Sequence, residues 1–246
     1  MVKKWTGCVG DSEFFLAAPP GFRPFRKEEP VEVYTRTLPH WRQPGCSYFV
    51  TFRTADSLPA AARTEMAARR EEWDRENPPP YSEAQLAERG RLLSNVEERW
   101  LDAGHGACPF GLRQPRDLLE AALREAGVKH ATTRAYVCMP NHVHAIIGPV
   151  AGVEDEEKPG RLEDALRMIK GRSSYQVNLA LKTSGALWAR EGYDRIVRDR
   201  KHLWRCLQYI GRNPRKAGLR AGSHARWVCK DWKEAGWVFK PPELRR

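Results

Sequence analysis

Two short apolar segments separated by a tight turn limit most strongly what this chain can fold into. The first covers residues 134–139 and the second residues 142–147, with Pro140-Asn141 between them. Both are short and rich in residues that strands favour, and a two-residue connection is the usual link of a β-hairpin. The pattern therefore predicts two antiparallel strands joined by a turn, and with them a sheet in the fold.

The second of these strands carries two histidines, His142 and His144. Alternate side chains of a strand share one face, so both imidazoles point the same way, opposite to Val143 and Ala145. Two neutral imidazoles side by side can hold one divalent ion if a further oxygen or nitrogen donor completes the site. Such a pair on its own is more often an ordinary pair of core or surface histidines, so the metal hypothesis needs support elsewhere.

The other periodicities predict helices and strands on both sides of this hairpin. The β-branched and aromatic run at 46–53 indicates a first strand, and Ser82 after three prolines is suited to cap a helix. We expect helices at 58–75, 82–101, 114–126, 162–181 and 201–212, and a short strand at 196–197. Asn213-Pro214 should end the last helix, because proline disfavours helical backbone before it. This order predicts an α+β fold with helices packed on an antiparallel sheet.

Length and composition indicate one domain with appendages. We expect an N-terminal arm at 1–45, a main domain at 46–220 with a helical insertion at about 55–103, and a basic, Trp-rich C-terminal extension at 221–246.

The six cysteines include no C-x-x-C pair, which favours a reducing cytoplasm over disulfides or a thiolate zinc site. His105 and Cys108 lack a second ligand pair, so a loop histidine and a packed cysteine are the simpler interpretation. No apolar run is long enough for a membrane span, and no signal peptide is evident, so we expect no membrane partner.

The last predicted helix places a tyrosine and an asparagine on one face. Tyr209 and Asn213 are four residues apart, which is about one helical turn. If this face meets the histidine pair, the amide oxygen of Asn213 can complete a metal site beside Tyr209. A tyrosine hydroxyl has a pKa near 10 and attacks poorly at neutral pH, unless a cation such as Mg²⁺ or Mn²⁺ lowers that pKa or activates the target phosphate. The alternative is an ordinary tyrosine that packs on an amphipathic helix.

Three motifs, in this order along the chain, resemble one known family. The segment Met139-Pro140-Asn141-His142-Val143-His144 is similar to the His-hydrophobic-His motif of the single-tyrosine HUH transposases. Residues 188–199 resemble the Trp-to-Arg-Asp segment of that family, and residues 209–219 resemble the catalytic-helix motif of its REP-associated tyrosine transposase branch. The resemblance spans roughly residues 48–219.

This resemblance implies a ferredoxin-like sheet with the histidine pair on a central strand. It implies that Tyr209 cuts single-stranded or hairpin DNA through a 5′-phosphotyrosine link and releases a 3′-hydroxyl, in DNA transposition or the mobilisation of repeated palindromes. His142, His144 and Asn213 would hold the metal, Mg²⁺ or Mn²⁺. The N-terminal arm and the helical insertion depart from the compact members of the family, which leaves open the substrate and the choice between a monomer and a homodimer. Tyr175 and Tyr193 are rival nucleophiles, but neither has a potential metal ligand four residues later in a helix.

The charge of the chain favours a nucleic-acid partner over a merely soluble basic protein. The sequence has 42 Lys and Arg against 31 Asp and Glu, a formal net charge of +11. Basic residues gather in the C-terminal half and predict a groove for the DNA backbone. The predicted DNA-binding residues are Lys170, Arg172, Arg198, Lys201, Arg205, Arg212, Arg215 and Lys216. Five tryptophans could stack unpaired bases or, more often at such spacing, fill a core: Trp188, Trp204, Trp227, Trp232 and Trp237.

Two other functions fit part of these observations. One is a nucleic-acid-binding protein of the same fold that does not cut, in which the histidines and the tyrosine are structural. The other is a metal-dependent hydrolase of small phosphate esters, in which the histidine pair serves a zinc-bound water. The hydrolase needs further ligands, and the sequence contains no H-x-x-E-H or H-E-x-x-H motif. A covalent adduct with DNA distinguishes a cutting enzyme from both.

Overall fold

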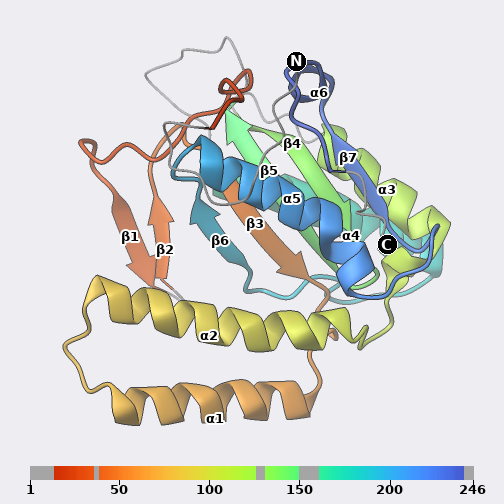
Figure 1. The fold of residues 1–246 in the computed structure, drawn as a ribbon. Helices are drawn as coiled ribbons and strands as arrows, with labels where there is room; N and C mark the ends of the chain where they lie inside the picture. Colours follow the sequence, from red (N-terminus) through yellow and green to blue (C-terminus); the bar gives the residue numbers. More distant parts are fainter. Residues whose placement is uncertain (1–13, 36–38, 126–130, 150–160, 241–246) are drawn as a thin grey trace, which may run out of the picture.

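A five-stranded antiparallel sheet lies at the centre of the computed structural model, which describes residues 14–35, 39–125, 131–149 and 161–240 (Figure 1). The strands lie in the order β6-β3-β5-β4-β7, and every neighbouring pair is antiparallel. Their bounds are β3 Tyr48–Arg53, β4 Ala131–Cys138, β5 His142–Pro149, β6 Tyr193–Ile196 and β7 Ala225–Val228. The strand β5, which carries the histidine pair, is therefore the central one.

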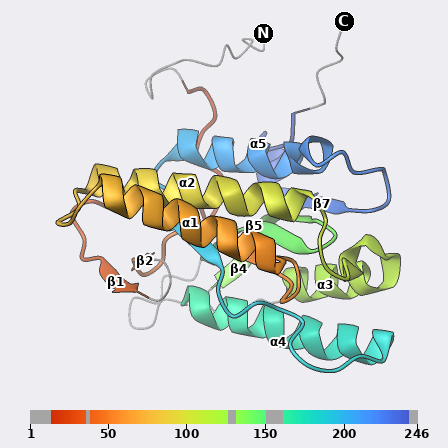
Figure 2. The same ribbon diagram turned by 90° about the horizontal axis from the view of Figure 1, so that it is seen from below.

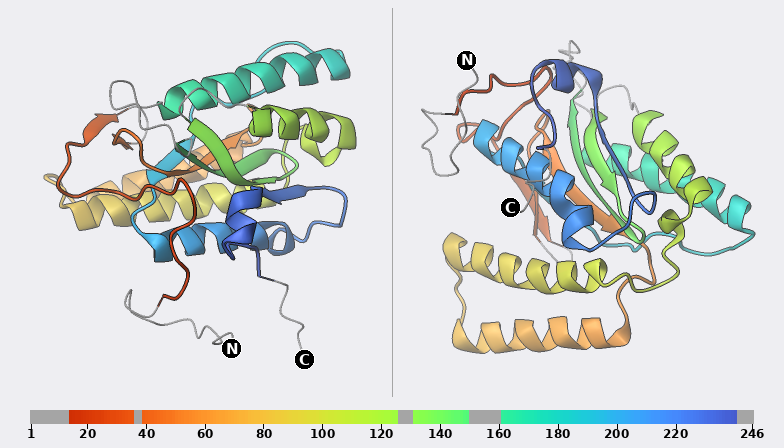
Figure 3. Two further views of the ribbon diagram at one scale, coloured as in Figure 1. Left: turned by 90° about the horizontal axis from the view of Figure 1, so that it is seen from above. Right: turned by 45° about the vertical axis from the view of Figure 1, so that its right-hand side comes forward.

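The connections between the strands make the fold a split β-α-β-β-α-β unit of the ferredoxin-like kind. The helices α3 (Arg113–Glu125) and α4 (Leu162–Leu181) pack against each other on one face of the sheet, and α5 (Arg200–Lys216) lies on the opposite face (Figure 3). A short 3₁₀ helix, Pro109–Gly111, precedes α3. The predicted α+β class with helices on an antiparallel sheet is confirmed.

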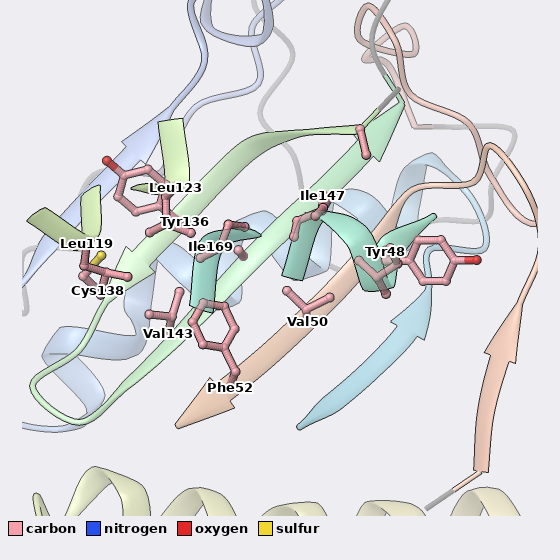
Figure 4. Close-up of a cluster of buried hydrophobic side chains, with 14 of the residues drawn as sticks. Tyr48, Val50, Phe52, Leu119, Leu123, Tyr136, Cys138, Val143, Ile147 and Ile169 are labelled. Atoms are coloured by element: carbon pink, nitrogen blue, oxygen red, sulfur yellow. The ribbon is translucent and has the colours of Figure 1, made fainter. Parts of the chain in front are cut away.

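Strand alternation divides the core into two clusters. Tyr48, Val50 and Phe52 of β3 point with the odd-numbered residues of β5 toward α3 and α4 (Figure 4). Phe49 of β3 and Ile146 of β5 belong to the second cluster, which α5 covers. Because the period of a strand is two, the same register turns His142 and His144 toward α5.

Two long helices, α1 (Ala60–Glu76) and α2 (Glu83–Asp102), form the predicted insertion between β3 and α3. Ser82 caps α2 as expected: its hydroxyl accepts from the Gln85 backbone N–H, and the Gln85 side chain accepts from the Ser82 backbone N–H. The pair lies across the end of the sheet at which β3 finishes and β5 begins (Figures 1 and 2). The insertion therefore borders the histidine pair.

The segments at the two ends of the chain contain more structure than their sequences indicate. Residues of the predicted arm form a hairpin, β1 (Glu32–Thr35) with β2 (Pro39–Arg42), and residues of the predicted extension form β7 and α6 (Lys230–Glu234). The indole N–H of Trp232 donates to the Pro20 carbonyl, and that of Trp237 donates to the Ala17 carbonyl. These contacts join residues more than 200 positions apart in the sequence, which explains why no local periodicity reveals them.

The end of α5 differs from the prediction. The helix does not stop at Asn213-Pro214 but continues to Lys216, with Pro214 inside it. Proline removes one N–H from the helical ladder, and here that loss falls in the last turn, where both Asn213 and Pro214 are buried by packing. As a result Asn213 stays helical and keeps the one-turn relation to Tyr209.

None of the helices in the described part of the chain is long and apolar enough to cross a membrane.

Gly211 of α5 gives a stability test of this packing. A Cβ at this position would lie 2.8 Å from the Phe239 ring, which belongs to the C-terminal segment packed over α5. We expect Gly211→Ala to lower the free energy of unfolding by about 1–3 kcal/mol, because the ring must move. Urea denaturation followed by circular dichroism measures the change.

The matched control is Gly171→Ala in the middle of α4, where an added Cβ meets no atom within 4 Å. That substitution should stabilise the protein by up to about 1 kcal/mol, since alanine has the higher helix propensity. Equal effects of the two substitutions would contradict the packing of Phe239 on Gly211.

Candidate active site

The histidine pair is buried under α5 with its distal nitrogens facing each other. The Nε2 atoms of His142 and His144 are 3.1 Å apart, and the two rings are nearly perpendicular. The side chains lie on the sheet beside β3, where His144 is opposite Thr51 and His142 is opposite Arg53. Both residues are almost completely buried. The two imidazoles predicted on one strand face thus converge on a single point.

The amide of Asn141 determines which nitrogen of His142 carries the proton. Its Nδ2 donates to the carbonyls of Leu101 and His105, at 3.3 and 3.0 Å. The amide oxygen of Asn141 therefore faces Nδ1 of His142, 2.7 Å away, and can only accept. Neutral His142 consequently carries its proton on Nδ1 and presents a bare Nε2, the form in which imidazole binds a metal.

His144 has a more adaptable partner. Its Nδ1 lies 2.8 Å from the Thr51 hydroxyl, which can either donate or accept. If Thr51 accepts, Nε2 of His144 carries no proton either. Two nitrogens that each lie about 2.1 Å from one ion, and that make a right angle at that ion, are about 3 Å apart. If Thr51 donates, His144 carries its proton on Nε2 and donates to His142. The pair is therefore satisfied both with and without a metal.

Both histidines are neutral at physiological pH. Burial, and then the nearby Lys216 ammonium, lower the pKa of His142 to about 3. Burial also lowers the pKa of His144 well below its ordinary value, helped by His142 and Lys216. Protons therefore do not compete with a metal for these nitrogens until the solution is strongly acidic.

Asn213 supplies the third candidate ligand from α5. Its side chain is buried, and neither its amide oxygen nor its amide nitrogen has a hydrogen-bond partner within the described residues. An unpaired buried amide is costly and needs an explanation. A metal-bound role for the oxygen provides one, so the residues present fit a divalent ion held by two imidazoles and an amide.

Acidic and thiolate ligands do not add to this set. In the ranges that the structure describes, no group of three or more His, Cys, Asp or Glu is arranged to hold a metal. His105 stacks near Trp100, and the Cys108 thiol donates to the Gly104 carbonyl. Their simpler interpretation, a loop histidine and a packed cysteine, agrees with these contacts.

Tyr209 lies directly against the histidine pair. Its ring meets the His144 ring edge-on with centroids 5.0 Å apart, and meets Phe49 of β3 in the same way at 5.7 Å. Burial, followed by the carboxylates of Glu98 and Asp102, raises the pKa of Tyr209 well above its ordinary value. The hydroxyl is therefore protonated at neutral pH.

The insertion helix α2 contributes carboxylates that the sequence did not point to. The negative charge of Glu98 contributes to the raised pKa of Tyr209, and Lys216 of α5 pairs with both Glu98 and Asp102. The second oxygen of Asp102 is buried without a hydrogen-bond partner among the described residues. These two acids are one helical turn apart, a spacing too common on solvated helices to be a signal.

The rival tyrosines have different surroundings. Tyr175 lies on the outer side of α4, 72% exposed and on the face of the sheet away from the histidines. Tyr193 on β6 is opposite Thr51 and packs in the same cluster as Tyr209, so it is near the site. Only Tyr209, however, has the helical relation to Asn213 and the ring contact with His144.

The predicted DNA-binding residues fall into two groups. Arg205, Arg212 and Lys216 follow the same solvent-facing side of α5 as Tyr209, at helical spacing. Lys170 and Arg172 are on α4, across the sheet, where Lys170 donates to the Ala189 carbonyl and Arg172 pairs with Glu125. The structure therefore does not bring Lys170 and Arg172 to the histidine pair.

The remaining members of the predicted set lie at the two ends of α5. Arg198 precedes the helix and is exposed, Lys201 lies in the first turn, and Arg215 is exposed in the last turn.

We name Arg205, Tyr209, Arg212 and Lys216 the α5 stripe. Four of the five tryptophans proposed for stacking or core packing are buried, which supports the core alternative: Trp188, Trp204, Trp232 and Trp237.

Comparisons with known proteins do not assign the chain to a family. No protein-family model and no curated protein matches it. A solved structure described as a REP-associated tyrosine transposase bound to a REP hairpin is similar, with a TM-score of 0.34 and 16% sequence identity. The match covers 76% of this chain and 74% of that one. A likeness of this strength carries no functional argument, so the function has to be argued from the site itself.

The neutral histidines predict how stability depends on pH. In the unfolded chain a histidine takes up a proton below about pH 6.5, whereas His142 in the fold does not until about pH 3. Protons therefore favour the unfolded state, and each such histidine lowers the free energy of unfolding by up to about 1.4 kcal/mol per pH unit below pH 6.5. Urea unfolding in EDTA at pH 7.5, 6.5 and 5.5 measures the slope.

His202 tests the additivity of this effect, because burial also lowers its pKa, to about 4. His202→Gln keeps an acceptor for the Arg198 backbone N–H and removes the titrating imidazole. It should therefore reduce the slope of the free energy of unfolding against pH by the contribution of one histidine. A free energy of unfolding that does not change from pH 7.5 to 5.5 would mean that the buried imidazoles take up protons in the folded protein.

Proposed function

We propose that this protein is a metal-dependent DNA strand transferase that cuts single-stranded or hairpin DNA through a 5′-phosphotyrosine intermediate on Tyr209. Three features of α5 and β5 together support the proposal. Two neutral imidazoles present their Nε2 atoms, an unpaired Asn213 amide is buried one turn from Tyr209, and the Tyr209 ring lies against His144. A purely structural pair would not require all three.

The chemistry follows from what each residue can do. A divalent ion, Mg²⁺ or Mn²⁺, would be held by His142, His144 and Asn213, and it polarises a phosphate oxygen when bound. Tyr209 attacks the phosphorus and releases its hydroxyl proton to solvent, a Tyr–O–P bond forms, and the bond to the 3′ oxygen breaks. The 3′ oxygen leaves with the electron pair and takes up a proton from water. Tyr209 retains the strand on the 3′ side of the cut through its 5′ phosphate, ready for transfer to another 3′-hydroxyl.

The α5 stripe supports a nucleic acid as the substrate. Arginine and lysine side chains on both sides of Tyr209 along one helix can contact consecutive phosphates of a strand and place one of them at the hydroxyl. The formal charge of +11 adds a general attraction for DNA. We further propose that the protein acts in the cytoplasm on transposing DNA or repeated palindromes, as a monomer or homodimer.

One observation favours a second candidate function, a nucleic-acid-binding protein that does not cut. The histidine pair can satisfy itself without a metal if His144 donates to His142 while Thr51 donates to His144. In that protein the α5 stripe would still bind DNA, and Tyr209 would only pack against His144. The two candidates differ in whether a covalent adduct forms.

The first test removes one oxygen atom. Tyr209→Phe keeps the ring and its contacts with His144 and Phe49, so folding and hairpin binding should persist while cleavage and the adduct both disappear. Incubation with labelled hairpin oligonucleotides and Mn²⁺, followed by denaturing electrophoresis and peptide mapping, measures the result.

Tyr175→Phe and Tyr193→Phe are the matched controls, one far from the histidine pair and one near it. Both variants should still form an adduct. An adduct mapped to Tyr193 would reassign the nucleophile, and no adduct from the wild-type protein on any hairpin would favour the non-cutting candidate.

The second test separates metal-dependent chemistry from DNA binding. His144→Ala, or EDTA added to the wild-type protein, removes the metal but leaves the α5 stripe in place. Cleavage should fall to background in both cases, while the dissociation constant for the hairpin changes by no more than a few-fold. Filter binding and gel-resolved cleavage on the same samples measure the two quantities. Cleavage at the normal rate in EDTA would contradict the metal site.

A further inference from the structure

We propose that two copies of this protein associate through the outer side of α4, with the two α4 helices packed antiparallel about a twofold axis. The proposal selects the homodimer over the monomer, and it does not depend on the cutting activity. Its basis is one row of residues on α4 that is apolar in the middle and charged at its ends. We name Asp164, Met168, Gly171, Tyr175 and Leu179 the outer row of α4.

The middle of the outer row exposes an unusual amount of apolar surface. Met168 is 43% exposed, Tyr175 72% and Leu179 69%, and they are three of the nine large hydrophobic side chains that are exposed in the described part of the chain. The row advances by three or four residues at each step, so it follows one face of the helix, opposite to the buried face. Helix α4 lies at the outer edge of the molecule (Figures 2 and 3). An apolar row in this position indicates an interaction surface.

The outer row is complementary to itself when a second copy runs in the opposite direction. Two antiparallel copies of a helix bring together residues that lie equally far from its centre, which for this row is near residues 173–174. Met168 then meets Leu179 of the second copy, and Gly171 meets Tyr175 of the second copy. An added Cβ at Gly171 would meet no atom within 4 Å, so this position has room for a tyrosine ring. Each contact forms twice, as a twofold interface requires.

The charges at the ends of α4 match in the same direction. Asp164 lies in the first turn, and the exposed Lys182 is the C-cap residue. The antiparallel arrangement places each Asp164 beside a Lys182, whereas a parallel arrangement would bring like charges together. The arginines that border the row have acidic partners within their own chain, because Arg167 pairs with Asp164 and Arg172 pairs with Glu125. The positive charge beside the row is therefore offset before a second copy approaches.

This arrangement leaves both candidate active sites accessible. Helix α5, with Tyr209, lies on the face of the sheet opposite to α4 (Figure 3), so the two histidine pairs of a dimer are on its outer sides. One helix from each copy buries less than the roughly 1,200 Å² that characterises stable interfaces. We therefore expect a weak dimer, with a dissociation constant of about 10–100 µM.

The first test measures the mass of the full-length protein without DNA by sedimentation equilibrium, from about 1 to 500 µM. The wild-type protein should change from one chain to two over this range. Met168→Lys should raise the dissociation constant by about 10–100-fold, because each dimer would bury two ammonium groups in an apolar contact. The matched control is Leu86→Lys on α2, since Leu86 is also 43% exposed; it should leave the dissociation constant unchanged. Circular dichroism verifies that both variants fold.

The second test exchanges the charges at the ends of the row. Asp164→Lys alone and Lys182→Asp alone each bring like charges together at both ends of the interface, and should raise the dissociation constant by about 3–10-fold. An equimolar mixture of these two variants should dimerise as tightly as wild type. In the mixed dimer, both ends again join one positive and one negative side chain.

Three results would overturn the inference. A wild-type protein that stays monomeric up to about 500 µM would exclude the dimer, and a dimer that Met168→Lys does not weaken would exclude the outer row as its interface. A mixture that dimerises no more tightly than the separate variants would exclude the antiparallel arrangement. None of these results bears on cutting, which the covalent adduct measures, and the absence of an adduct would leave the dimer unaffected.

Discussion

The burial of two imidazoles on the central strand is the constraint on which the rest of the site depends. Strand β5 has β3 on one side and β4 on the other, and both of its faces are covered by helices. A buried histidine must be neutral and hydrogen-bonded, or its desolvation is not offset. Asn141 and Thr51 meet that requirement at the Nδ1 atoms and leave both Nε2 atoms pointing at each other. A bound cation, or one proton shared between the two Nε2 atoms, removes the repulsion between their lone pairs.

Helix α5 continues past the local stop signal at Asn213-Pro214. The helix buries nearly all of one side, and the C-terminal segment packs over it: Gln208 exchanges hydrogen bonds with the backbone of Val238 and Lys240, and the Phe239 ring lies on Gly211. Asn213 and Pro214 in the last turn are buried as well. Tyr209 consequently contacts His144 from the same helix face that carries Asn213 one turn later.

The insertion contacts the helix that carries Tyr209, through Glu98 and Asp102 of α2 and Lys216 of α5. Helix α2 places carboxylates beside a tyrosine that carries basic neighbours on its own helix. The two helices are therefore joined by ion pairs between mostly buried carboxylates and the half-exposed Lys216. Burial and these carboxylates together raise the pKa of Tyr209. A tyrosine in this position has to lose a strongly held proton in order to act as a nucleophile.

Local patterns determined much of the fold. Strand alternation at 142–147, the Ser82 cap and the apolar spacing of α4 and α5 predicted the main elements, since each depends on residues a few positions apart. The four-residue step from Tyr209 to Asn213 and the two-residue step from His142 to His144 likewise defined which side chains share a face. A short-range pattern can do this because the helix and the strand have fixed periods.

The tertiary structure decided what no short-range pattern contains. The hydrogen bond of Thr51 with His144 depends on the register of β3 against β5, and the ion pairs of Glu98 and Asp102 with Lys216 depend on how α2 lies against α5. In the C-terminal segment, β7 pairs with β4, and Trp232 of α6 and Trp237 bond to carbonyls near the start of the chain, all distant in the sequence. The same structure separated Lys170 and Arg172 from the α5 stripe, although all were basic residues of one half of the chain. Sequence alone specifies the face on which a side chain lies, whereas its partner is chosen only when the packed elements bring two faces together.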